Sequence, residues 1–380
     1  MTTRATFGAR NLPGRGALPA RLSPWRRARR VTSIALCLCL VPVAISYLNS
    51  VTGPSNSSFT IRSFEWLRDN GAASVASQIE SVYYSLNAPS TGGPPLRKLP
   101  MTAHPAADAI HPPDIPPAIQ PAVVGEGVWT PSEHWGGPNS PVQVARFRSD
   151  PNYPRLVAGV AWIDTARTWI DLYPGRLEPS VNVPRGSMEV PLPARSRLLA
   201  TFNSAFKLED SGGGVALNGR TYAPMKPGIA TLVRYASGGV DVQSWAGGPE
   251  VPPGVKFARQ NLPLIVSGGR PNPDLSDGPA WGATLGNAVR VWRSGVGVDA
   301  HGNLICAAAN DQSVGSLAQI LIRAGAIRAM ELDINSYWVT FVTYGDPFAG
   351  RPSSLLPSMT RGGNRYLTPD DRDFLAVYLR

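Results

Sequence analysis

The spacing of apolar and polar positions first separates a membrane-like stretch near the N-terminus from the rest of the chain. Residues 31–48, VTSIALCLCLVPVAISYL, are predominantly apolar and carry no charge. Eighteen residues of α-helix span roughly 27 Å, which is just enough to cross the hydrocarbon core of a bilayer. The pattern therefore predicts one transmembrane helix at 31–48, preceded by a tail at 1–30.

Two segments of different character follow this stretch. Residues 58–87 place Phe64, Ile79 and Tyr83 at mixed helical spacing, which predicts a juxtamembrane helical segment. Pro and Gly dominate residues 88–124, in runs such as PSTGGPP and HPPDIPP. This composition favours an extended, semi-rigid linker that forms no core of its own.

Short strand-like runs dominate the remaining chain, from residue 125 to residue 380. Roughly 250 residues suit a single domain. Only two segments have convincing helical spacing, 316–324 and 369–379. The predicted fold class is α+β, a strand-rich mixed-sheet domain with few helices, preceded by one N-terminal transmembrane helix. We expect residues 125–380 to fold without the linker.

One helix and the strand after it carry the clearest chemical signal. Ser316 is a suitable N-cap with Gln319 at the capping-box position, and Gly325 ends the helix. The following residues alternate like a strand, so Glu331 and Asp333 are expected on the same face. Two carboxyl groups at a strand end are suited to acid/base chemistry on an acetal.

Charge is concentrated at the N-terminus and is nearly balanced elsewhere. The net charge is +10, but residues 1–30 hold eight Arg and no acidic residue, which leaves +2 for the other 350 residues. A basic tail without a basic domain face argues against nucleic-acid binding. Positive charge before the apolar stretch predicts a cytoplasmic N-terminus and an extracytoplasmic domain in a single-pass membrane protein.

A cleaved signal peptide is the alternative for the same stretch. Ala44, Ile45 and Ser46 satisfy a small-x-small cleavage pattern, although they lie inside the apolar run. The run is long for the apolar region of a signal peptide. We therefore expect an uncleaved anchor, with the cleaved form left open.

Cysteine and histidine give no sign of a disulfide or a zinc site. Cys37 and Cys39 lie in the apolar stretch, and Cys306 is alone in the rest of the chain. The four His are scattered, and no Cys/His group has zinc-ligand spacing. No cofactor and no metal is expected. A divalent ion held by Asp333 and Glu331 is left open as an alternative.

Polar residues at two other strand ends are candidate ligand contacts. Asn203 and Lys207 end one strand and precede Gly212, Gly213 and Gly214, so an amide and an ammonium group could meet an anionic oxygen. In the alternative interpretation, Asn203 only satisfies backbone groups in a turn.

Arg293 is a candidate because it lies within an otherwise apolar strand pair. A buried Arg needs a partner, which is either a structural carboxylate, Glu331 or Asp333, or an anionic ligand. The two options are compatible, since active sites use such networks.

The order of these segments resembles the phosphodiester glycosidase family, which includes the uncovering enzyme that removes N-acetylglucosamine from phosphate-linked sugar diesters. The resemblance covers roughly 200–344 and rests on NSAFK, a later Gly-Gly segment, RSGVGVDAHGNL, a helix and RAMELDINS. The family's usual pattern has Asn-Gly-Gly-Phe-Phe, Arg-Thr-x-x-Gly and Asn-Leu-Asp-Gly-Gly-Gly-Ser. Its Asn, Arg and Asp fall on Asn203, Arg293 and Asp333.

The chain departs from the family at the glycine turn. The Asn before Leu-Asp falls on Glu331, the triple glycine falls on residues 334–336, and the following Ser falls on Tyr337. A glycine turn lets backbone N–H groups face a phosphate, and bulkier residues obstruct that approach. The chain is similar to an exported bacterial variant with a divergent motif, and its substrate is left open.

Together, the residues and the resemblance imply a membrane-anchored extracytoplasmic hydrolase of a glycosyl phosphodiester or a related cell-envelope glycan. Asp333 is then the principal acid/base or nucleophile, with Glu331 as partner carboxyl. Arg293 and Lys207 neutralise the phosphate, while Asn203, Asn335 and Ser336 contact the substrate. The sugar, the stereochemical outcome and the oligomeric state are not indicated.

The alternative function is a non-catalytic envelope glycan-binding or scaffold protein. Trp281, Tyr337 and Trp338 could then stack on sugar rings, although core packing suits Trp338 best. A catalytic site requires the carboxylates, Arg293 and Asn203 to converge in one cleft. A binding protein requires only an aromatic platform.

Overall fold

The computed structural model describes residues 23–100, 110–132, 139–276, 278–282 and 290–380, which form parts of two compact units. The first unit, residues 1–52, contains helix α1 (Pro24–Thr52). No residue of this helix is buried. This helix is longer than the predicted span of 31–48. Its length and composition would let it cross a membrane, although a signal sequence near the N-terminus meets the same criterion.

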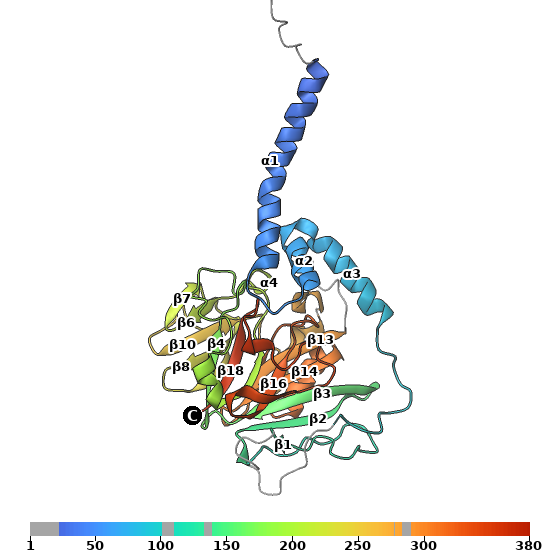
Figure 1. The fold of residues 1–380 in the computed structure, drawn as a ribbon. Coiled ribbons are helices and arrows are strands. Elements are labelled where there is room, and N and C mark those ends of the chain that lie inside the picture. Colours follow the sequence, from blue (N-terminus) through green and yellow to red (C-terminus); the bar gives the residue numbers. More distant parts are fainter. Residues whose placement is uncertain (1–22, 101–109, 133–138, 277, 283–289) are drawn as a thin grey trace, which may run out of the picture. The chain divides into compact units, whose positions relative to one another are not determined.

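The second unit, residues 53–380, is built on three antiparallel sheets (Figure 1). The largest sheet has eight strands in the order β1-β2-β3-β14-β13-β15-β11-β12. Their bounds are β1 Thr130–Pro131, β2 Val142–Asp150, β3 Tyr153–Ile163, β14 Leu304–Gln312, β13 Val291–Val298, β15 Arg328–Glu331, β11 Val266–Ser267 and β12 Arg270–Pro271.

Two five-stranded sheets complete the unit. One has the order β7-β6-β10-β8-β9, with β7 Arg220–Ala223, β6 Val215–Leu217, β10 Val255–Gln260, β8 Ala230–Tyr235 and β9 Val240–Ser244. The other has the order β17-β16-β5-β18-β4, with β17 Gly350–Ser354, β16 Phe341–Asp346, β5 Leu198–Asn203, β18 Phe374–Leu379 and β4 Thr168–Tyr173. Val142, Phe202 and Leu232, one from each sheet, belong to the same central core.

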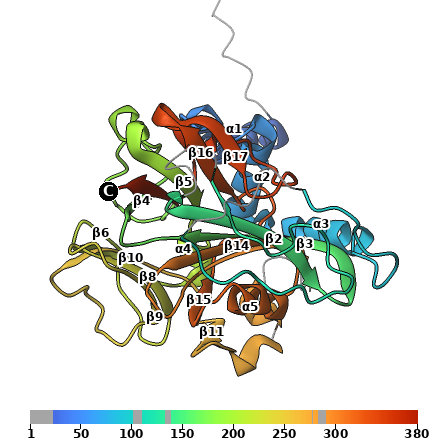
Figure 2. The same cartoon turned by 90° about the horizontal axis from the view of Figure 1, so that it is seen from below.

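Helix α5 (Val314–Arg323) covers the outer face of the large sheet (Figure 2). Successive side chains of β14 point to opposite faces, so Ile305 and Ala307 meet α5 while Leu304 and Cys306 enter the central core. Both faces of β14 are therefore buried, which explains why its sequence is apolar without alternation.

The predicted helix 316–324 is confirmed, with a start two residues earlier than expected. Ser313 is the N-cap, and its hydroxyl oxygen accepts the backbone N–H of Ser316. Gly325 has a φ of 102°, a left-handed conformation that Gly adopts readily, and ends the helix as predicted.

The predicted helix at 369–379 is wrong. Residues 374–379 form β18, which lies between β5 and β4 in its sheet. Leu375 and Val377 face the central core, while Phe374 and Ala376 face a second cluster. A strand buried on both faces has no period-two pattern, so its apolar run resembled a helix. The fold class itself, a strand-rich α+β domain with few helices and one long N-terminal apolar helix, is confirmed.

Residues 58–87, predicted to be a juxtamembrane segment, are largely helical and belong to the second unit. Their elements are α2 (Phe59–Leu67), a short π-helical turn (Arg68–Ala72) and α3 (Ala73–Leu86); a fourth short helix, α4 (Leu208–Ser211), follows β5. The Ser58 hydroxyl caps α2. Before α2, the Asn56 N–H donates to the Pro369 carbonyl at 2.9 Å, and the Ser55 hydroxyl donates to Asp371 at 2.6 Å.

The Pro-rich stretch is held to the sheets at several points. Leu99 and Ile115 are buried, and the Ile115 N–H donates to the Gly127 carbonyl. Glu126 forms a fully buried ion pair with Arg148 of β2 at 2.6 Å. Independent folding of residues 125–380 stays a prediction.

We expect the Glu126–Arg148 pair to be essential for stability, because removing one partner leaves a buried charge unpaired. Arg148→Met should lower the free energy of unfolding by about 3–5 kcal/mol. The same substitution at the exposed Arg270 is the matched control and should change it little. Denaturant unfolding of the full chain in detergent measures both. Equal effects at the two positions would contradict this account.

Candidate active site

Asp333 lies just beyond the end of β15, where the backbone leaves the sheet. Its N–H donates to the Ser204 carbonyl at 3.1 Å, and its own carbonyl accepts the Ser294 hydroxyl at 2.7 Å. The Asn203 amide in turn donates to the Ser294 hydroxyl oxygen at 2.9 Å. These bonds join the end of β5 and the middle of β13 to the residue that follows β15, which fixes the position of Asp333.

The Asp333 carboxylate forms a buried ion pair with Arg372. Its Oδ2 lies 2.5 Å from Arg372 Nη2, and its Oδ1 accepts the Asn335 N–H at 3.0 Å. Arg372 Nε has no hydrogen-bond partner among the described residues. The Arg372 guanidinium also lies 5.4 Å from the centre of the Trp338 ring. A carboxylate therefore lies beside a guanidinium group that still has an N–H donor, at Nε, without an acceptor among the described residues.

Lys207 adds a second cation to this place. It immediately precedes α4, and Nζ contacts Glu65 Oε2 at 2.9 Å and Asp69 Oδ1 at 2.5 Å. Both carboxylates come from the juxtamembrane helical segment. Burial lowers the pKa of Lys207, but these two carboxylates outweigh burial and raise it above its usual value. The ammonium group therefore stays charged.

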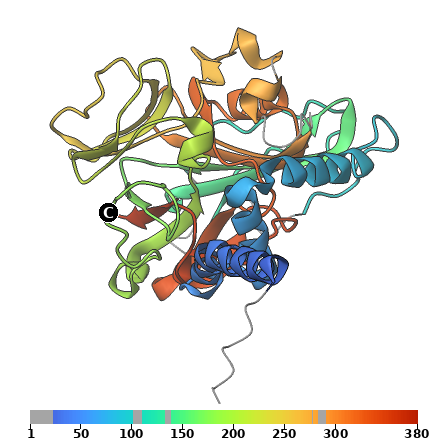
Figure 3. The same ribbon diagram turned by 90° about the horizontal axis from the view of Figure 1, so that it is seen from above.

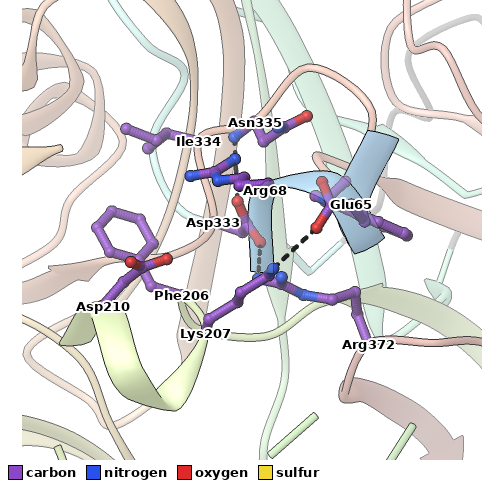
Figure 4. A pocket seen from close by; sticks show the side chains of 10 residues that line it. Glu65, Arg68, Phe206, Lys207, Asp210, Asp333, Ile334, Asn335 and Arg372 are labelled. Atoms are coloured by element: carbon purple, nitrogen blue, oxygen red, sulfur yellow. Dashed lines mark hydrogen bonds and ion pairs between the residues drawn. The ribbon is translucent and has the colours of Figure 1, made fainter. Parts of the chain in front are cut away.

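These groups line a narrow pocket of about 30 Å³ (Figure 4). Figure 4 shows Lys207, Asp333 and Glu65 pointing toward one another, with Arg372 beside them. The lining residues are Glu65, Arg68, Phe206, Lys207, Asp210, Asp333, Ile334, Asn335, Trp338 and Arg372. Charges of both signs therefore meet in one small space, and one wall comes from α2 and the turn that follows it.

Two carboxyl groups of the pocket differ in their electrostatic environment. Asp333 is paired with Arg372, whereas no ion pair is found for Asp210 among the described residues. Partial burial raises the pKa of Asp210, although Arg68 and Lys207 oppose that shift. Unequal environments of this kind let one carboxyl act as a base or nucleophile while another donates a proton.

Glu331 and Arg293 lie outside the pocket and pair with each other. Arg293 Nη1 contacts Glu331 Oε1, and the guanidinium also donates to the Gln312 and Trp281 carbonyls. Glu331 has no exposed surface, and burial raises its pKa to about 7, against the lowering effect of Arg293. Their catalytic assignment stays a prediction. Arg293 precedes Ser294 in β13 and Glu331 ends β15, so this pair suits support of the neighbouring Ser294 and Asp333.

The pocket brings together only some of the predicted site residues. Asp333, Lys207 and Asn335 line it, whereas Asn203 and Ser336 do not. Asn203 is buried, and its Oδ1 accepts the Thr340 N–H at 2.9 Å. Asn203 thus satisfies neighbouring polar groups and connects to Asp333 through the Ser294 hydroxyl and the Ser204 carbonyl. Its role in substrate binding stays a prediction.

The aromatic residues considered for sugar stacking do not form an open platform. Trp281 and Trp338 are buried. Tyr337 is half-buried, and the Arg361 guanidinium lies over its ring at 4.4 Å. Trp281 belongs to the apolar cluster around α5, whereas Trp338 lines the pocket, and neither offers an exposed surface for stacking.

Sequence reasoning missed Arg372, although the run Asp370–Asp373 marks its position. Each of these four residues makes an ion pair, and three of the partners are distant in sequence. The pairs are Asp370 with Arg365, Asp371 with Arg176, Arg372 with Asp333, and Asp373 with Arg259. Four charges directly before an apolar strand are a detectable signal of buried pairing.

Comparison with known proteins gives a distant likeness of fold. No family model and no curated protein matches the chain. The structure resembles the zebrafish N-acetylglucosamine-1-phosphodiester alpha-N-acetylglucosaminidase catalytic domain auto-inhibited by pro-peptide, with a TM-score of 0.44 and 15% identity over 70% of this chain and 95% of that one. It also resembles a hypothetical protein from Synechocystis, with a TM-score of 0.39 and 14% identity over 64% of this chain and 63% of that one.

The raised pKa of Glu331 predicts a specific pH dependence of stability. Its folded value of about 7 lies above the usual 4.5, so the folded protein binds this proton more tightly than the unfolded chain does. The resulting stabilisation is complete below pH 4.5 and is lost as pH rises to about 7. Relative to Glu331→Gln, the native protein should therefore lose on the order of 1–3 kcal/mol over that range.

Denaturant unfolding at a series of pH values measures this difference. Glu250→Gln, at an exposed position, is the control and should run parallel to the native protein. A pH-independent difference between the native protein and Glu331→Gln would show that Glu331 has an ordinary pKa.

Proposed function

We propose that this protein is a membrane-anchored extracytoplasmic hydrolase that acts on a glycosyl phosphodiester or a related cell-envelope glycan. The observation that carries the proposal is the Asp333–Arg372 pair beside Lys207 in a polar pocket. Two cations next to a fixed carboxylate suit a substrate that presents an anionic group close to the bond to be cleaved. The N-terminal helix α1 would be the anchor.

The cations have a defined task in this proposal. A phosphodiester and the Asp333 carboxylate repel each other, so positive charge must lie close to both. Arg372 already contacts Asp333, and Lys207 lies on the same pocket wall. The two cations would bind the phosphate oxygens and stabilise the charge that grows on the departing phosphate.

In this proposal Asp333 would attack the anomeric carbon, either directly or by activating a water molecule. In the overall reaction, water adds to the anomeric carbon and the bond from that carbon to the phosphate oxygen breaks. The phosphate monoester leaves with the bonding electrons. Asn335 would orient substrate oxygens, and Asp210, a second carboxyl group that lines the pocket, would be the proton donor.

The α2 segment closes this site in the structure. Glu65 and Asp69 contact Lys207 where the proposal places the anionic group of the substrate. Burial raises the pKa of Glu65, but Lys207 and the neighbouring arginines outweigh burial and lower it, so this carboxylate is held as an anion. Substrate binding would exchange the carboxylates for the phosphate.

Asp333→Asn tests the proposed chemistry. The variant should fold but be less stable, because the buried Arg372 loses its charged partner. Turnover of sugar-1-phosphodiesters per folded molecule should fall by roughly 10²-fold or more, because acid/base or nucleophilic function is lost. Kinetics and thermal unfolding of the full chain in detergent measure the two properties. Asp274→Asn, at an exposed position, is the matched control and should retain full activity. Equal turnover in both variants would rule out Asp333 as the catalytic group.

Combining Glu65→Gln with Asp69→Asn tests the closed state. Removing both charges weakens the contact with Lys207. Each 1.4 kcal/mol by which the closed state is destabilised raises the ratio of open to closed molecules about tenfold. The kcat/KM for sugar-1-phosphodiesters should therefore rise by about tenfold. Glu209→Gln, on the exposed side of α4, is the control. An unchanged or lower kcat/KM would mean that α2 does not limit access.

A further inference from the structure

The juxtamembrane helices expose an unusual share of large apolar side chains. Ten such residues are exposed in the described part of residues 53–380, and five of them lie between residues 59 and 86. The five are Phe59, Leu67, Val75, Val82 and Leu86. Single exposed apolar residues are ordinary, but a cluster on one short segment indicates an interaction surface.

Three of these residues form one stripe along α3. Val75, Val82 and Leu86 are spaced by seven and four positions, so they project from the same helix face. Their exposed fractions are 56%, 59% and 81%. Ala76, next to Val75 but turned about 100° around the helix, is buried. Ala76 therefore marks the side of α3 that packs on the unit, while the apolar stripe lies on an exposed side of the helix. Figure 3 shows the helix itself at the edge of the unit.

The short connection between α1 and α2 limits how far the start of α2 can lie from the end of α1. Helix α1 ends at Thr52 and α2 begins at Phe59, so only residues 53–58 connect them. Six extended residues reach at most about 21 Å. If α1 crosses a membrane, α2 begins within that distance of the bilayer surface. Helix α3 follows α2 after a turn of five residues, Arg68–Ala72. An exposed apolar face on a helix that follows a membrane span so closely in sequence is suited to the headgroup–acyl boundary, where such faces are buried.

We propose that the α3 stripe rests on the outer surface of the bilayer that α1 crosses, and that it forms a second membrane contact. The inference rests on the proposed anchoring by α1, but not on hydrolase activity. Glu65 and Arg68, from the helical segment that leads into α3, line the pocket. Docking of α3 would therefore hold the pocket close to the lipid headgroups, where it could accept an anionic glycan attached to the membrane.

Fluorescence quenching in vesicles tests this contact. The full chain is reconstituted in phosphatidylethanolamine–phosphatidylglycerol vesicles, with Cys37 and Cys39 replaced by Ala and the buried Cys306 retained. A single cysteine is introduced at Val82 and labelled with an environment-sensitive dye. Lipids carrying nitroxides at two depths then locate the dye. The expected position is within about 5–10 Å of the headgroup–acyl boundary.

Two controls separate the possible outcomes. A label on native Cys39 in α1 reports whether the anchor lies in lipid, and a label at Ser237, in the exposed turn between β8 and β9, should stay unquenched. Quenching at Cys39 without quenching at Val82 overturns the second contact and leaves the anchor intact. A dye at Val82 that is shielded from water but not quenched by lipid shows a protein partner, which also overturns it. An unquenched Cys39 removes the anchor and the inference with it.

Discussion

The arrangement of the pocket depends on the ion pair between Asp333 and Arg372. It joins the chain leaving β15 to the loop that enters β18, two segments from different sheets. Burial opposes the charge on Arg372, but Asp333, Glu178 and Glu65 outweigh it and raise the pKa of the guanidinium. The cation therefore stays charged in a place where an unpaired charge would be costly. A fixed carboxylate next to a fixed cation is the core of the proposed site.

The segment between the apolar helix and the domain links two properties of the molecule. Its carboxylates meet Lys207 across the pocket, while the outward face of α3 carries apolar side chains. Because Glu65 and Asp69 already contact Lys207, a substrate anion can bind there only if it displaces these carboxylates or if α2 moves away. If α3 rests on a bilayer, the membrane surface and the substrate would act on the same helical segment. Access of substrate to the pocket would then depend on whether α3 is bound to the bilayer.

Sequence reasoning recovered the parts of the fold that follow from local patterns. The long apolar helix, the strand-rich domain and the helix ended by Gly325 each have a local signal. The strand β18 was missed because burial on both faces removes the alternation that marks a half-buried strand. Asp333 and Lys207 were found at strand ends, but Arg372 and Glu65 required knowledge of which distant segments meet. Glu331 and Arg293 form a buried pair outside the pocket, an arrangement that sequence alone does not distinguish from pocket-lining groups, and their catalytic assignment stays a prediction.

The most direct test of the central claim is the position of bond cleavage. A sugar-1-phosphodiester is incubated in water enriched in heavy oxygen with the full chain carrying the Glu65→Gln and Asp69→Asn substitutions, and the phosphate product is followed by phosphorus NMR. Cleavage at the anomeric carbon, with Asp333 as the attacking or activating group, predicts a phosphate monoester that contains no heavy oxygen. Heavy oxygen in the phosphate would show attack at phosphorus and contradict a glycosidase, and the absence of any hydrolysis across sugar-1-phosphodiesters would contradict the proposed activity.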